Sequence, residues 1–167
     1  MLTAGDVPPY YPTPPHVVRR MLDLAEIRAD DVLADLGSGD GRIPIAAATI
    51  YGIRACGCEL RPDLVAAARK NAEAAGVAHL VKFLQRDLFE VDLAEASVVT
   101  LYLLTPVNVA LRPTLLRALR PGSRIVSYCF RMGTWAPEII AREDARSIYR
   151  WTIPHQADGR PDADDPD

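Results

Sequence analysis

The residues of this chain best suited to bind a nucleotide begin at Asp35, where the sequence reads Asp-Leu-Gly-Ser-Gly-Asp-Gly-Arg. The apolar residues Val32 to Ala34 precede this segment and isoleucines and alanines follow it, which predicts a buried strand before it and a helix after it. Glycines in such a turn let a ligand approach the backbone without meeting a Cβ atom. We therefore predict a nucleotide-binding loop.

The spacing of the glycines and of two later acidic residues indicates which kind of nucleotide the loop binds. A dinucleotide fingerprint needs its third glycine where this chain has Arg42, whereas the third glycine here is Gly41. Glu59 ends the next apolar segment, 22 residues after Gly37, where a carboxylate can accept both hydroxyls of a ribose. Asp87 ends a third strand-like segment. Acids thus close three successive predicted strands, and a pyrophosphate ligand is disfavoured.

This ordered set, Asp-x-Gly-x-Gly-x-Gly followed by two strand-end acids, resembles the cofactor site of class I S-adenosylmethionine-dependent methyltransferases. The resemblance implies that Asp35 holds the methionine end of the cofactor, that the glycines allow its close approach, that Glu59 binds the ribose and that Asp87 accepts from the adenine amine. A plainer interpretation is that Asp35 only fixes the loop and Asp87 only caps a turn. The cofactor-binding residues implied by the resemblance are Asp35, Gly37, Ser38, Gly39, Gly41, Glu59, Leu60, Asp87 and Leu88.

Three further segments, residues 9–14, 98–104 and 135–137, are similar to one subgroup of these enzymes. The subgroup comprises archaeal protein-lysine methyltransferases and the mitochondrial lysine methyltransferases acting on the ATP synthase c subunit and the adenine nucleotide translocase. The similarity implies that the acceptor side is formed by Tyr10, Thr13, Tyr102 and Trp135, with Asn108 as a weaker candidate. The alternative roles are structural, namely a helix cap for Thr13 and packing for the aromatic residues.

Length and composition favour one folded domain. The 167 residues, 49% of them hydrophobic and 25% charged, suit a single core. We expect the methyltransferase domain to span residues 1–153 and the polar, acidic, proline-containing residues 154–167 to be a disordered tail. No apolar run reaches the ~18 residues of a membrane span, and the first residues lack the pattern of a secretion signal. A cytoplasmic enzyme with no membrane partner is expected.

The net charge of −3 is concentrated at the C-terminus. Residues 154–167 carry five aspartates and one arginine, which leaves 18 basic and 17 acidic residues for the rest of the chain. A nearly neutral body argues against a nucleic-acid partner, because broad capture of nucleic acid needs a dense basic stripe. Four arginines that could form a local patch are interpreted as a solvated helix face: Arg117, Arg120, Arg124 and Arg131.

The cysteines and histidines suggest no metal site. Cys56 and Cys58 alternate along one predicted strand and Cys129 falls in another, which favours packing as small apolar residues. The three histidines are far apart in sequence, with no ligand-like spacing. We expect each histidine to be solvated or to cap an element.

Alternating patterns predict a Rossmann-like α/β fold. Strands are expected at 32–36, 54–59, 81–86, 97–104 and 123–130, and helices at 41–51, 62–75 and within 107–119. Another helix should precede them, with Thr13 as its N-cap, while Pro113 should kink the last helix or begin its main part. Residues 147–153 suit a terminal strand with its partner near 138–141. The family implies a mostly parallel seven-stranded sheet with helices on both faces and an antiparallel C-terminal strand.

We expect the chain to transfer methyl groups from S-adenosylmethionine to lysine side chains of a protein substrate. The lysine must be neutral to attack and its free pKa is ~10.4, so a dry channel lined by tyrosine and tryptophan would favour the reactive form. Two alternatives remain: a small-molecule methyltransferase, and a catalytically silent cofactor-binding partner subunit. An Asn/Asp-Pro-Pro-Tyr motif after the fourth strand is absent, which counts against adenine methylation in nucleic acid.

Overall fold

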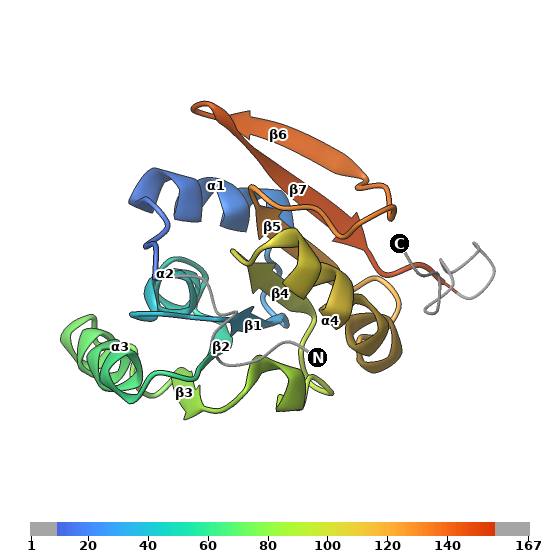
Figure 1. Cartoon of the computed structure of the whole chain (residues 1–167). Helices are drawn as coiled ribbons and strands as arrows, with labels where there is room; N and C mark the ends of the chain where they lie inside the picture. The colour runs from blue at the N-terminus through green and yellow to red at the C-terminus, as the bar shows by residue number, and fades with distance from the viewer. Residues whose placement is uncertain (1–9, 156–167) are drawn as a thin grey trace.

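The computed structural model describes residues 10–155, which form a seven-stranded sheet in the order β3-β2-β1-β4-β5-β7-β6 (Figure 1). Its parallel strands are β1 (Val32–Leu36), β2 (Arg54–Glu59), β3 (Val81–Gln85), β4 (Val98–Leu101) and β5 (Arg124–Tyr128). The hairpin of β6 (Ile139–Glu143) and β7 (Arg146–Thr152) closes the sheet, with β7 antiparallel to β5. The predicted fold class is confirmed. Of the tail expected at residues 154–167, all but residues 154 and 155 lies outside the described residues.

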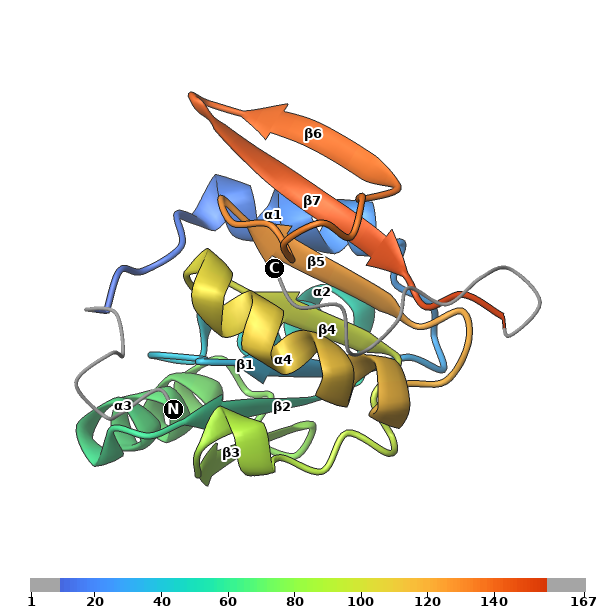
Figure 2. The same ribbon diagram turned by 45° about the vertical axis from the view of Figure 1, so that its right-hand side comes forward.

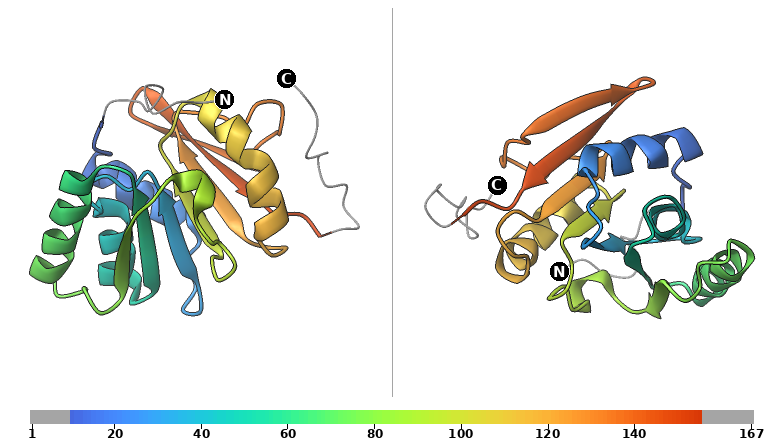
Figure 3. Two further views of the ribbon diagram at one scale, coloured as in Figure 1. Left: turned by 60° about the horizontal axis from the view of Figure 1, so that its bottom comes forward. Right: turned by 180° about the vertical axis from the view of Figure 1, so that it is seen from behind.

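Helices cover both faces of the sheet. On one face α1 (Pro15–Ala25), α2 (Arg42–Tyr51) and α3 (Pro62–Ala74) share one apolar cluster. On the other face α4 (Thr105–Ala118) packs in a second apolar cluster. Along the chain, β3 and β4 are connected by a segment whose only helix is the short 3-10 helix η2 (Leu88–Glu90). Figure 2 shows α4 in front of the sheet and α2 behind it, and the views in Figure 3 show the same division. Within residues 10–155, no helix is long and apolar enough to cross a bilayer.

Local sequence explains where the helices begin and end. The apolar face of α1 is buried, and α2 ends where Gly52 adopts a left-handed conformation with φ 66°. Arg61 precedes α3 without a side-chain cap, while Pro62 supplies the fixed backbone angle of a first helical residue. The elements therefore follow from residue types at their ends.

Several predicted boundaries were wrong. Thr13 is not a helix cap, because Pro14 occupies the N-cap position and makes no side-chain bond there. The strand expected to reach residue 104 ends at Leu101, and α4 begins at Thr105, ahead of the expected start, and continues through Pro113. The early end of β4 matters for the site, because it frees the next residues to turn over the sheet edge.

The cysteine and arginine interpretations need partial correction. Cys56 and Cys58 pack together in the cluster beneath α4, as expected, but Cys129 lies beyond the end of β5 with φ 69°. Arg124 does not belong to a solvated face: it is 5% exposed, forms an ion pair with Asp31 and donates from Nε to a carbonyl at the end of α1 (2.9 Å). A buried charge needs such partners, so Arg124 joins α1 to the sheet.

Candidate active site

A pocket of about 90 Å³ opens at the carboxyl edge of the sheet, where β1 and β4 are neighbours. From β1 the strand order runs to β2 and β3 on one side, whereas β4 and β5 lie on the other side of β1. The order therefore reverses between β1 and β4, and such a topological switch point is where α/β proteins bind ligands. The walls are the glycine loop after β1, residues 10–13, the end of β2 and the residues that follow β4.

Asp35 forms the buried floor of the pocket. It lies near the end of β1, is 3% exposed and accepts a 2.7 Å hydrogen bond from Thr100 Oγ1 on β4. Burial raises the pKa of Asp35 to about 7, the Thr100 hydrogen bond opposes the rise, and the nearby Glu59 and Asp40 carboxylates add to it. Asp35 is therefore poised to change charge near neutral pH.

Gly37 and Gly39 form the lip of the pocket in conformations that other residues rarely adopt, with φ of 80° and 53°. The amides of Gly37 and Ser38 donate to the carbonyl of Cys58 at 2.8 and 2.9 Å, which fixes the loop against β2. A Cβ on Gly39 would lie 2.4 Å from the ring of Tyr10. The absence of a side chain at Gly39 therefore lets the Tyr10 ring lie directly against the loop backbone.

Two loop residues of the predicted cofactor site have tightly packed surroundings: Ser38 lines the pocket, whereas Gly41 does not. Gly41 begins α2 with φ 80°, and a Cβ there would lie 2.5 Å from the ring of Phe83 and 2.9 Å from Ala68. Its small size therefore serves helix packing, and its contact with the cofactor stays a prediction. Ser38 is 5% exposed, its Oγ has no hydrogen-bond partner among the described residues, and a Cβ on Gly57 would lie 2.5 Å from it.

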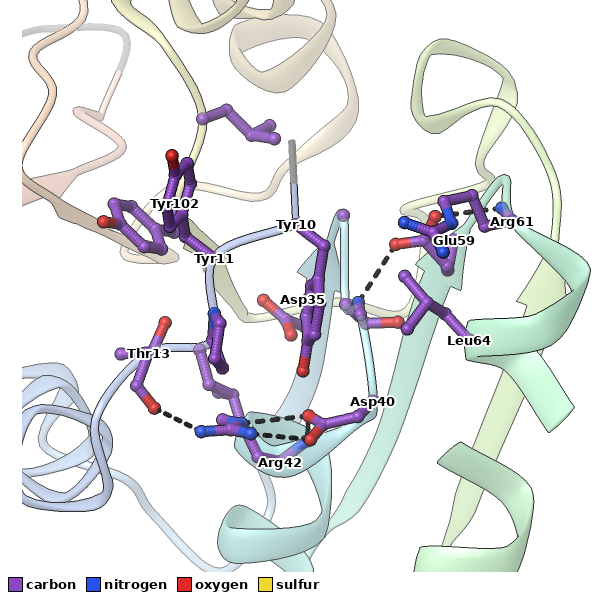
Figure 4. A pocket seen from close by; sticks show the side chains of 16 residues that line it. Tyr10, Tyr11, Thr13, Asp35, Asp40, Arg42, Glu59, Arg61, Leu64 and Tyr102 are labelled. Atoms are coloured by element: carbon purple, nitrogen blue, oxygen red, sulfur yellow. Dashed lines mark hydrogen bonds and ion pairs between the residues drawn. The ribbon is translucent and has the colours of Figure 1, made fainter. Parts of the chain in front are cut away.

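Glu59, the last residue of β2, faces the pocket and organises its rim. One carboxylate oxygen accepts from the Gly39 amide at 3.1 Å and the other from the Arg61 amide at 2.9 Å (Figure 4). A carboxylate has about four lone-pair sites, so Glu59 retains acceptor capacity for a ligand.

Aromatic side chains form the opposite end of the pocket. Figure 4 shows Tyr102 and Tyr11 across the pocket from Glu59. Tyr102 follows β4, its ring lies 4.8 Å from that of Tyr128, and its hydroxyl accepts from Arg146 Nη1 at 2.9 Å. Burial raises the pKa of Tyr102, although the Arg146 guanidinium opposes the rise. The pocket therefore has an acidic end and an aromatic end.

Asp40 and Arg42 are pocket residues that the sequence reasoning missed. Arg42 donates from Nε and Nη2 to the two oxygens of Asp40 at 2.9 and 2.6 Å, and from Nη1 to the carbonyl of Thr13 at 2.9 Å. The available signal was the arginine itself, which stands where a dinucleotide fingerprint has its third glycine. Its role depends on a residue 29 positions away, which spacing did not reveal.

Other predicted residues lie outside the pocket. Asp87 Oδ1 accepts from the Phe89 amide at 3.0 Å and caps η2, which matches the plainer interpretation of that residue. Leu60 is 45% exposed beyond β2, and Leu88 is half-buried within η2. These positions border the β2–β3 side of the sheet edge and do not line the described cavity.

Trp135 and Asn108 also have structural surroundings. The ring of Trp135 lies 6.0 Å from that of Trp151, and its carbonyl accepts from Trp151 Nε1 at 2.9 Å. Asn108 is fully buried in α4 and donates to the carbonyls of Phe130 and Arg131 at 3.3 Å. The structure therefore does not bring Trp135 or Asn108 to the pocket.

One histidine has partners that sequence spacing did not suggest. His16 and Asp144 are joined by a 2.7 Å contact although 128 positions separate them, and Glu143 completes a group whose ligand-type atoms lie within 4.8 Å of one another. The His16 and Asp144 side chains are 53% and 65% exposed, and they lie on α1 and the β6–β7 turn, away from the pocket walls.

Comparison with known proteins identifies the family. Residues 35–139 match the model described as the ANTKMT methyltransferase domain, which covers more than half of the chain. The chain belongs to the ANTKMT methyltransferase domain family. It is 43% identical over 150 residues to a protein-lysine N-methyltransferase of Saccharolobus islandicus, which covers 87% of this chain and 93% of that protein. It is also 35% identical to the adenine nucleotide translocase lysine N-methyltransferase of Mus musculus, over 87% of this chain but only 63% of that protein.

Solved structures agree with this assignment. A structure described as an RNA methyltransferase from Salinibacter ruber in complex with S-adenosyl-L-homocysteine superimposes with a TM-score of 0.87 at 55% identity, covering 91% of this chain and 97% of that chain. The chain is therefore an S-adenosylmethionine-dependent methyltransferase. As a member of the ANTKMT family it shares the cofactor, whereas these relatives are described as acting on different acceptors, protein lysine and RNA.

The residues present fit this cofactor. S-adenosylmethionine carries a sulfonium, an ammonium and a ribose diol, and the pocket supplies the carboxylates of Asp35, Asp40 and Glu59 beside a loop without Cβ atoms at Gly37 and Gly39. Carboxylates suit cations and hydroxyls and would repel the pyrophosphate of a dinucleotide.

Proposed function

We propose that this ANTKMT-family enzyme methylates lysine side chains of a protein substrate. The observation that carries the proposal is the 43% identity to a protein-lysine N-methyltransferase across 93% of that protein. The aromatic end of the pocket supports it, because Tyr102 and Leu103 offer an apolar wall beside the acidic cofactor end. A neutral amine is favoured over a charged one in such surroundings.

The carboxylates that line the pocket have hydrogen-bond partners within the protein, and the proposal assigns their remaining capacity to the cofactor. Asp35 is bonded to Thr100, Asp40 to Arg42, and Glu59 to the Gly39 amide. We therefore propose that no dedicated base removes the acceptor proton and that the apolar wall selects the neutral amine from solution. Turnover should then rise toward alkaline pH without the bell shape of an acid–base pair.

The proposed cofactor site extends beyond the pocket. Asp35 would hold the methionine end, Glu59 the ribose, and Gly37 and Gly39 would allow close approach; Ser38 contributes its backbone. Leu60, Asp87 and Leu88 would hold the adenine end along the β2–β3 edge. The cofactor supplies an electrophilic methyl group, and the chain positions and desolvates the acceptor. On the acceptor side the pocket supports Tyr10, Thr13 and Tyr102, whereas Trp135 would act only through packing.

Methyl transfer from isotope-labelled S-adenosylmethionine into a lysate of the source organism tests the proposal. Mass spectrometry after protease digestion should find label on lysine side chains above the level of lysate alone, and Glu59→Ala enzyme should add much less. Label that resists protease and is released by nuclease would overturn the protein acceptor. Label only in small metabolites would assign a small-molecule methyltransferase, and no label anywhere would favour a silent cofactor-binding subunit.

RNA is the second candidate acceptor, because the Salinibacter ruber structure at 55% identity is described as an RNA methyltransferase. The nearly neutral body of this chain favours protein over nucleic acid, and the burial of Arg124 removes one arginine from the patch that could bind phosphates. Purified total RNA in the same assay should therefore remain unlabelled.

We also propose a cytoplasmic location. All three cysteines, Cys56, Cys58 and Cys129, are free thiols, which suits a reducing compartment. Fractionation of the source organism followed by immunodetection would test this, and recovery in a membrane fraction would contradict it.

A further inference from the structure

Residues 10–14, called here the strap, cross the mouth of the pocket before α1 begins. Pro12 and Pro14 lack backbone N–H groups, so the strap cannot pair with a neighbour as an ordinary strand does. Arg42 reaches across and donates from Nη1 to the Thr13 carbonyl at 2.9 Å. The Arg42 side chain therefore attaches the strap to the rest of the protein, which backbone pairing at the prolines cannot do.

The same arginine is fixed to the glycine loop. Its Nε and Nη2 groups donate to both oxygens of Asp40, and the side-chain Nδ2 of Asn71 in α3 donates to the Asp40 carbonyl at 3.0 Å. The Arg42 and Asp40 side chains are only 33% and 24% exposed, so this bidentate pair is more shielded from water than an ordinary surface ion pair. Figure 4 shows Arg42 between Thr13 on one side and Asp40 on the other.

The strap places the Tyr10 ring against the glycine loop. The Tyr10 ring occupies the space in front of Gly39, where Cε2 would lie 2.4 Å from an added Cβ. Figure 4 shows the Tyr10 side chain pointing toward Asp40, and burial together with this carboxylate raises the pKa of Tyr10. With Tyr10 in this position the cavity is about 90 Å³, well below the ~300 Å³ at which small-molecule pockets usually begin.

We propose that Arg42 is a positioning residue that clamps the strap onto the glycine loop through Thr13 and Asp40, so that Tyr10 closes the site and cofactor exchange requires this clamp to open. The proposal rests on the cofactor assignment and is independent of the acceptor. It explains why an arginine follows the last glycine: the guanidinium has separate donors for a carboxylate and a carbonyl, whereas lysine has one ammonium.

The rate at which S-adenosyl-L-homocysteine leaves the full chain tests the clamp without an acceptor. Arg42→Ala should release S-adenosyl-L-homocysteine about tenfold faster than wild type, the factor expected when a charge-assisted hydrogen bond is lost. Chymotrypsin should cut the Tyr10–Tyr11 bond faster in the same variant, since the Tyr11–Pro12 bond resists the protease. The matched control is Arg54→Ala, which loses an exposed 3.2 Å ion pair with Glu95 at the amino ends of the strands, opposite the pocket. This control should behave as wild type.

Two further variants separate the clamp from a general loss of fold or charge. Arg42→Lys keeps the charge but carries all its donors on one nitrogen, so it cannot reproduce the two-point pair with Asp40 together with the Thr13 bond, and full rescue by lysine would overturn the proposal. Tyr10→Ala removes the cover without touching Arg42 and should also speed release, while the double variant should be no faster than either single one. The proposal would also be overturned if Arg42→Ala changed neither cofactor release nor cleavage. If Arg42→Ala fails to fold, Tyr10→Ala decides, and an unchanged release rate in that variant would overturn the proposal.

Discussion

Thr100 faces Asp35 directly across the β1–β4 pairing, and its hydroxyl donates a 2.7 Å hydrogen bond to Asp35 Oδ1 inside the protein. Both residues are buried, and burial raises the pKa of Asp35 to about 7 although this hydrogen bond opposes the shift. The pair places a titrating carboxyl at the floor of a site that binds a cationic cofactor.

The Asp35 carboxyl should make the free protein less stable as the pH rises. Its pKa is near 3.8 when unfolded and about 7 when folded, so between these values the folded state holds the extra proton. The stabilisation is complete below pH ~4 and is lost through pH ~7. Thermal melting between pH 5 and 8.5 should show this decline in wild type and lack it in Asp35→Asn, and parallel curves would contradict the assignment.

Cofactor binding should have the opposite pH dependence. A cationic ligand favours ionised Asp35, so affinity for S-adenosylmethionine should increase from pH 6 to 8 with release of a proton. Calorimetry in buffers of different ionisation enthalpy measures that proton. Thr100→Val removes the bond that lowers the Asp35 pKa and should move the midpoint to higher pH; a midpoint that stays in place would show that the hydrogen bond does not control the carboxyl.

Glu59→Ala should weaken S-adenosylmethionine binding by roughly 2 to 4 kcal/mol, because it removes charge-assisted acceptors and also frees the Gly39 amide. Glu95→Ala, an exposed residue on the opposite edge, is the control and should bind normally. Calorimetry gives both affinities. Tight binding by Glu59→Ala, or appreciable NAD binding by wild type, would refute the site assignment.

Gly41→Ala should destabilise the fold more than Gly52→Ala. Both glycines cap α2 with positive φ, at 80° and 66°, so both substitutions carry a similar backbone penalty. Only Gly41 would drive a Cβ into Phe83 and Ala68, whereas Gly52 faces open space. Urea denaturation should show an excess loss of about 1–3 kcal/mol at Gly41, the usual cost of overpacking. Equal losses would mean that the neighbours yield freely.

Trp135→Ala should lower stability and spare the cofactor. The Trp135 ring is half-buried against Trp151, so the loss should be about 2 kcal/mol, below the 3–5 of a fully buried aromatic residue. Differential scanning calorimetry and S-adenosyl-L-homocysteine titration measure the two effects. Lost methyl transfer with an unchanged melting temperature would instead place Trp135 at the acceptor.

The sequence alone predicted the alternating elements and the cofactor loop, because both depend on local chemistry. A buried parallel strand is a short apolar run, a glycine-rich turn follows it, and acids at successive strand ends meet at one sheet edge. The sequence therefore predicted one shared site for four residues that all line the pocket: Asp35, Gly37, Gly39 and Glu59.

Only the tertiary structure decided which neighbours each side chain meets. Gly41 serves packing because Phe83, which lies on β3, fills the space in front of it. Trp135 packs against Trp151 because the β6–β7 hairpin places Trp151 beside it. Arg42 bonds to the Thr13 carbonyl because the fold brings that oxygen within 2.9 Å of Nη1. Contacts between residues far apart in sequence are fixed by strand order and packing, so periodicity could not reveal them.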